Sequence, residues 1–168
     1  MQIWDIGIRL FHWSIALVFV LNYFLLEPGE TAHQIAGYYA FAWLIFRVVW
    51  GFLGPQRARF SDFLPTPSRI KTHFTHLKQR QLPRDAGHNP LGGVVIFLMM
   101  VLLAYQATTG FMLEEVDAFY GSSALEYLHE LGAHTLFALV CLHIVAVIFV
   151  QWWGRIQLIR PMITGRRD

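Results

Sequence analysis

The chain has 168 residues, of which 55% are hydrophobic and 14% are charged; its formal net charge is +2 and its mean hydropathy is +0.44. A typical soluble domain carries about 25% charged residues, so the composition excludes such a domain and favours one membrane-embedded domain over residues 1–168. The single cysteine, Cys141, excludes a disulfide, an iron–sulfur cluster and a four-cysteine zinc site within the chain. Nucleic acid is not expected as a partner.

Four apolar segments approach or exceed the roughly 20 residues that a membrane-spanning helix needs. They cover about residues 6–26, 33–53, 91–113 and 128–153. No small-residue cleavage site follows the first segment, so we expect it to be retained as a helix. The fold class predicted is all-α, an integral membrane four-helix bundle.

Residues 54–89 form a connector rich in Pro, Arg and Lys, in which the prolines break any long helix. Within it, Phe60, Phe63 and Leu64 precede basic residues, a pattern that fits either a short interfacial helix or an ordinary polar loop.

The charges predict the orientation. With four spans, both termini and the connector lie on one side of the membrane, and that side holds every Lys and Arg of the chain. The positive-inside rule makes this side cytoplasmic. The opposite side holds no Lys or Arg and carries acidic residues: Glu27, Glu30, Glu114, Glu115, Asp117, Glu126 and Glu130.

Histidines lie in or at the edge of the apolar segments, where ionisable groups mark functional sites by default. Two of them, His129 and His143, are fourteen residues apart in the fourth segment. At about 100° and 1.5 Å per residue they share one helix face and are separated by about 21 Å. His12 lies at the cytoplasmic depth of His143, and His33 lies at the opposite depth with His129.

Helical bundles build cofactor sites from side chains on facing helices. The depths therefore predict two pairs, His12 with His143 on the cytoplasmic side and His33 with His129 on the other side. His134 is about 140° from His129 around the helix, and we expect it to form a hydrogen bond to a neighbouring helix instead. His88, before the third segment, is the competing candidate for the cytoplasmic ligand position, and otherwise for a propionate or quinone contact.

Two imidazoles at each depth are too few for zinc, which takes three or four protein ligands. They match the two axial positions of a haem iron, which would then have no vacant position and would favour electron transfer. The absence of a Cys-x-x-Cys-His motif excludes covalent attachment. Gly37, one turn after His33, leaves room for a porphyrin. Candidate propionate partners are Arg9, Arg47 and Arg59. The alternative is a haem-free membrane scaffold in which the histidines only pack.

Several motifs resemble the bacterial cytochrome b561 family, which is related to the b-type cytochrome subunits of nickel–iron hydrogenases and formate dehydrogenases. They are Phe11-His12-Trp13, His33 with Gly37, Gly87-His88-Asn89-Pro90, and His129-Glu130 with His143. The resemblance implies an inner-membrane protein with two haem b groups that exchanges electrons between the quinone pool and a partner. The family's ligand positions fall on His12, His33, His129 and His143.

The leading hypothesis is therefore electron transfer between quinone or quinol and a periplasmic redox protein, either a c-type cytochrome or a hydrogenase-like subunit. The acidic side would attract a basic patch on that partner. The alternative is a stand-alone enzyme that passes electrons from superoxide to quinone. Membrane lipid surrounds the bundle in either case, and a homodimer is an open alternative to a monomer.

Overall fold

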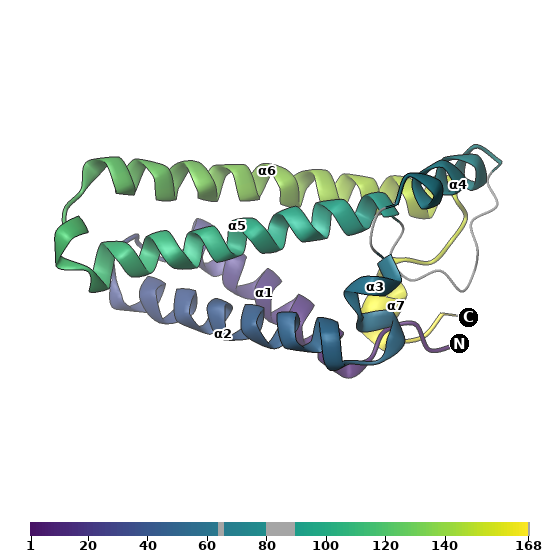
Figure 1. The fold of residues 1–168 in the computed structure, drawn as a ribbon, viewed down its shortest axis with the longest axis horizontal. Helices are drawn as coiled ribbons and strands as arrows, with labels where there is room; N and C mark the ends of the chain where they lie inside the picture. The colour runs from purple at the N-terminus through teal and green to yellow at the C-terminus, as the bar shows by residue number, and fades with distance from the viewer. Residues whose placement is uncertain (64–65, 80–89, 168) are drawn as a thin grey trace.

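The computed structural model describes residues 1–63, 66–79 and 90–167, and these residues are predominantly helical (Figure 1). Four helices in the described chain are long and apolar enough to cross a membrane. They are α1 (Ile6–Phe24), α2 (Thr31–Leu53), α5 (Pro90–Glu115) and α6 (Ser123–Trp153). The prediction of an all-α chain with four candidate membrane spans is confirmed.

The beginning of α6 differs most from the prediction. Ser122 is the N-cap, and its hydroxyl accepts a hydrogen bond from the amide of Leu125 at 3.4 Å. The helix therefore starts at Ser123 and not near residue 128, with Glu126 in its first turn, where an acidic side chain is favourable. His129 consequently lies nearly two turns inside α6, whereas the sequence placed it at the helix start.

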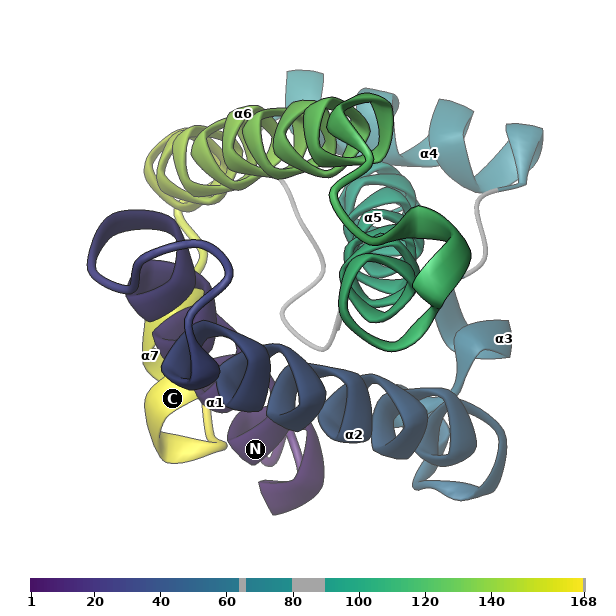
Figure 2. The ribbon, with the colours of Figure 1, turned by 90° about the vertical axis from the view of Figure 1, so that its left-hand side faces the viewer.

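The four long helices are arranged around a common axis (Figure 2). Helix α1 packs on α2, α2 on α5, and α5 on α6. The side between α1 and α6 is bridged by aromatic rings, with Tyr23 stacked on Phe137 at a centroid distance of 4.7 Å. Many large apolar side chains on the outer faces are exposed, among them Leu17, Val101 and Val145. Lipid is the natural cover for such faces in a multi-pass membrane protein.

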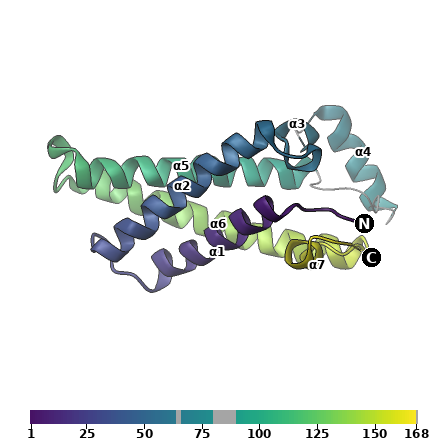
Figure 3. The ribbon, with the colours of Figure 1, turned by 90° about the horizontal axis from the view of Figure 1, so that it is seen from below.

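The two ends of the bundle are built differently (Figures 1 and 3). One end, called here the terminal end, contains both termini and the short elements η1 (Gln56–Ala58), α3 (Phe60–Phe63), α4 (Pro67–Lys78) and α7 (Ile159–Thr164). The other, called the loop end, contains the α1–α2 turn and the α5–α6 connection with η2 (Asp117–Phe119).

The connector between α2 and α5 thus contains helices. Phe60 and Phe63 lie in the single turn of α3, and Leu64 lies outside the described residues. Helix α4 follows because Thr66 caps it and Pro67 occupies its first turn, where a missing amide proton costs no hydrogen bond.

The terminal end is closed by contacts between the two ends of the chain. The amide of Ile3 donates to the carbonyl of Gly165 at 2.8 Å, and Gln2 pairs with Arg166 in an antiparallel bridge. Ile3, Trp4, Ile8 and Ala58 form a buried core here, with Trp50 and Met162 packed against it. The start of α1 is therefore anchored both to the C-terminal segment and to the end of α2.

Candidate functional site: two histidine pairs inside the bundle

His33 and His129 face one another from α2 and α6 near the loop end. Their ring centroids are 6.3 Å apart and their planes are inclined by 67°. The Nδ1 atom of His33 is buried and has no hydrogen-bond partner among the described residues. The two imidazoles thus approach each other across the bundle, as the sequence predicted, without bonding to each other.

The neighbouring helix α5 holds His129 at three points. The Thr109 hydroxyl lies 2.7 Å from Nδ1 of His129, and the amide of Gln106 donates to the His129 carbonyl at 2.9 Å. At Gly110, an added Cβ would lie 3.3 Å from Cε1 of His129, so glycine lets the imidazole lie close to the α5 backbone. The contacts of Thr109 and Gln106 with His129 were not predicted from the sequence. Two polar residues three positions apart within an apolar span were the signal.

His12 and His143 form the second pair, on α1 and α6 toward the terminal end. They are close enough to interact electrostatically. His12 is mostly buried, with its ring edge-on to Trp13 at a centroid distance of 5.1 Å, and its Nδ1 atom has no hydrogen-bond partner in the described part of the chain. His12 and His143 thus lie on α1 and α6 toward the same end of the bundle, and their pairing stays a prediction.

The ring separation of the His33–His129 pair leaves room for one metal ion between the two imidazoles. A ring nitrogen lies about 1.1 Å from the ring centre and binds a metal at about 2.0–2.1 Å, so two opposed imidazoles have centres about 6.3 Å apart. Among the described residues, no group of three or more His, Cys, Asp or Glu side chains could hold a metal ion. The donor set therefore suits haem, whose porphyrin supplies the other four ligands, better than a bare metal ion.

Gly37 lies one turn from His33 and faces open space. A Cβ atom built at Gly37 would meet no atom within 4 Å. A flat cofactor beside His33 would therefore find room at this position.

The three arginines proposed as propionate partners have different surroundings. Arg47 is 2% exposed, its guanidinium lies 4.7 Å from the Phe60 ring centroid, and its Nη1 atom is buried without a hydrogen-bond partner in the described residues. Arg59 is exposed, and its Nε donates to the carbonyl of Gly54 at 2.8 Å. Of these two, Arg47 is the better placed for an anionic group inside the bundle.

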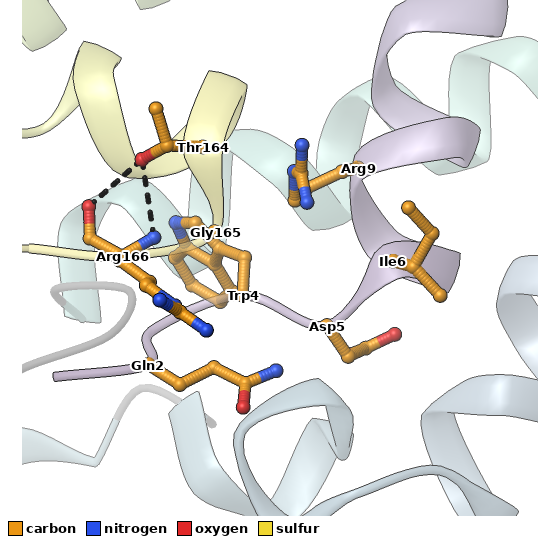
Figure 4. A pocket seen from close by; sticks show the side chains of 8 residues that line it. All are labelled: Gln2, Trp4, Asp5, Ile6, Arg9, Thr164, Gly165 and Arg166. Atoms are coloured by element: carbon orange, nitrogen blue, oxygen red, sulfur yellow. Dashed lines mark hydrogen bonds between the residues drawn. The ribbon is translucent and has the colours of Figure 1, made fainter.

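Arg9 is directed toward the terminal end. It donates to the carbonyl of Ile163 and lines a pocket of about 310 Å³ between the N-terminal segment and the end of α7 (Figure 4). Its Nε atom is buried and lacks a hydrogen-bond partner among the residues described. Arg9 thus lies one helical turn from His12 and keeps one donor available.

His134 makes the inter-helix hydrogen bond that the sequence predicted. Its Nδ1 lies 2.8 Å from the hydroxyl of Tyr23 on α1, and its Nε2 lies 3.5 Å from a carboxylate oxygen of Glu130. His134 is therefore engaged between α1 and α6, away from either pair. His88, the competing ligand candidate, lies outside the described residues.

A bundle of four membrane-spanning helices with imidazoles facing one another across its interior defines the class of helical membrane proteins that hold a cofactor between helices. Comparison with known families places the chain more closely. The sequence model of prokaryotic cytochrome b561 matches residues 3–165. The chain therefore belongs to the prokaryotic cytochrome b561 family, which implies membrane electron transfer through haem b.

Similar curated proteins carry the description "Probable Ni/Fe-hydrogenase B-type cytochrome subunit". The protein from Rhizobium leguminosarum bv. viciae is 28% identical, with 98% of this chain and 87% of the relative covered. The protein from Azotobacter vinelandii is 25% identical over the same shares of the two chains. No solved structure gives a significant match.

Proposed function

We propose that this protein carries electrons across the bacterial inner membrane through two haem b groups, between the quinone pool and a redox protein on the periplasmic side. The observation that carries the proposal is the His33–His129 pair, whose 6.3 Å ring separation would let both imidazoles hold one haem iron. His143 lies fourteen residues after His129 along α6, about 21 Å away, and we pair it with His12 on α1. Haem supplies an iron that alternates between the ferric and ferrous states.

In this proposal His33 and His129 hold one haem, and His12 and His143 hold the other. Two histidines would hold each haem, which would favour electron transfer over the binding of oxygen or another substrate at the metal. Gly37 leaves space beside the first haem. Arg47, with its buried and unpartnered Nη1, would hold a propionate of the second by a charge-assisted hydrogen bond.

The orientation rests on charge. All Lys and Arg residues belong to the terminal half of the molecule or to the connector, so the positive-inside rule puts the terminal end, with both chain termini, in the cytoplasm. The His33–His129 pair then lies near the periplasm. The acidic residues around the loop end would guide a basic surface of a partner toward that pair.

The partner class follows from the relatives. They are described as probable Ni/Fe-hydrogenase subunits, which supports a hydrogenase-like subunit as the partner that we propose. A c-type cytochrome is the alternative, since a basic surface on it would suit the acidic loop end. Quinone or quinol would exchange electrons from within the lipid. The whole chain then acts as a single di-haem domain.

The test is a haem count and a reduction assay on the purified full-length protein. We expect a reducible b-type absorption spectrum and about two haem b per chain by pyridine haemochrome. A short-tailed quinol should reduce the haems, or the corresponding quinone should oxidise them. Absence of a b-type spectrum, or a count of one haem, would overturn the proposal. Steady reduction of quinone by superoxide, without a partner, would support the stand-alone oxidoreductase instead.

A further inference from the structure

Thr109 occupies a buried position on α5, beside one proposed haem ligand. It is 5% exposed, and its hydroxyl lies 2.7 Å from Nδ1 of His129. On the same helix turn, Gln106 donates to the backbone carbonyl of His129. The ring and the backbone of one histidine are thus both held by a helix that carries no member of either histidine pair.

The Thr109 hydroxyl lies within hydrogen-bond distance of more acceptors than it has protons to donate. A threonine hydroxyl has one proton to donate, and the Thr109 oxygen lies 2.9 Å from the Tyr105 carbonyl and 3.2 Å from that of Gln106 on its own helix. When the proton goes to one of these carbonyls, the hydroxyl accepts a hydrogen bond from His129, and Nδ1 carries the proton. A neutral imidazole protonated on Nδ1 keeps its lone pair on Nε2.

We propose that Thr109 is a positioning residue that fixes the tautomer and the ring orientation of His129 so that Nε2 is presented to a haem iron. The inference rests on the proposed function, since it assigns a role toward the haem between His33 and His129. His12 and His33 each have a buried Nδ1 without a partner in the described chain. The Thr109 contact therefore distinguishes His129 from these two histidines.

Such a contact has measurable consequences for the haem. When the ring nitrogen that does not bind the metal donates a hydrogen bond to a neighbouring group, that bond fixes the orientation of the histidine and raises its basicity. Loss of such a neighbouring group typically costs about 10–100-fold in metal affinity. A more basic imidazole favours ferric over ferrous iron. Removing the hydroxyl should thus weaken ferric haem binding more than ferrous haem binding. A tenfold difference between the two would raise the one-electron reduction potential by about 59 mV.

The experiment compares three variants of the full-length protein. Thr109→Val keeps the branched shape and removes the hydroxyl, whereas Thr109→Ser keeps the hydroxyl and removes a methyl group. Thr108→Val is the matched control, because the Thr108 hydroxyl donates only to its own helix, to the Ala104 carbonyl at 2.8 Å. Equilibrium haem affinity of the haem-depleted protein and a potentiometric titration that resolves the two haems are the measurements.

We expect Thr109→Val to lose at least about tenfold in affinity for one haem and to raise the potential of that haem alone. Thr109→Ser and Thr108→Val should match the wild type. The second haem, on His12 and His143, reports whether the variant has folded. Wild-type affinity and potential in Thr109→Val would overturn the inference, as would equal losses in Thr109→Val and Thr109→Ser, which would assign the effect to packing. Failure of the wild type to bind two haems would instead overturn the proposed function.

Discussion

The two histidine pairs are organised by different parts of the molecule. His129 is held by side chains of a neighbouring helix, from Thr109, Gln106 and Gly110 on α5. His12 has no such hydrogen bond at Nδ1 within the described residues, and its helix is positioned by the closed terminal end one to two turns away. The first pair should therefore respond to local substitutions, and the second to changes at the end of α1.

The largest expected effect separates the pairs directly. Replacing His129 with alanine should lower the haem content from about two to about one per chain, and His143→Ala should do the same by removing the other haem. Pyridine haemochrome counts give the number, and potentiometric titration shows which haem remains.

His134→Ala is the control for these variants, because His134 is on the same helix but contacts Tyr23 and Glu130. It should keep both haems. Two haems in His129→Ala, or one haem in His134→Ala, would contradict the assignment of the pairs.

Gly37 offers a test of the space beside His33. Gly37→Leu should leave helix α2 intact, because an added Cβ would meet nothing within 4 Å and an interior glycine destabilises a helix by about 0.5–1 kcal/mol relative to alanine. Its side chain would, however, fill space that the proposed haem needs. We expect Gly37→Leu to lower haem affinity at the His33–His129 pair by at least about tenfold while the other haem stays bound.

Gly37→Ala is the matched smaller change and should give an intermediate loss. Haem titration of the depleted protein measures both variants, and its thermal unfolding shows whether the fold is preserved. Wild-type affinity for both haems in Gly37→Leu would mean that no cofactor uses this space.

Much of this architecture could be predicted because membrane spans follow from hydropathy. The four spans, their antiparallel order and the depths of the histidines all depend on long apolar segments and on helical periodicity. The predicted start of α6 was wrong because residues 123–127 extend the helix beyond the apolar segment. The Ser122 cap and Glu126 were the local signals for this earlier start.

Contacts between residues far apart in the chain could not be predicted from the sequence, because local patterns do not show which segments meet. Thr109 is hydrogen-bonded to a residue twenty positions away, and its three-residue spacing from Gln106 indicates a polar helix face without telling which helix that face contacts. The antiparallel pairing of Gln2 with Arg166 joins opposite ends of the chain. The short helix α7 has little apolar periodicity of its own and is defined by this packing.

The smallest predicted effect concerns the anchoring of α1. The carboxylate of Asp5 accepts hydrogen bonds from the amide of Ile8 at 3.1 Å and from the indole of Trp50 at 3.0 Å. Asp5→Ala removes an N-cap, at about 0.5–2 kcal/mol, and leaves the Trp50 donor unpaired. We expect the free energy of unfolding in a detergent titration to fall by about 1–3 kcal/mol.

Because α1 carries His12 seven residues after Asp5, this destabilisation should release the haem of the His12–His143 pair first. Asp5→Asn retains an acceptor for both donors and should behave nearly as the wild type. Ser122→Ala removes the corresponding cap at the loop end of α6, seven residues before His129. In Ser122→Ala, the contacts of Gln106 and Thr109 with His129 should keep the haem of the His33–His129 pair bound. Equal release of both haems in Asp5→Ala would show that the two pairs are not held independently.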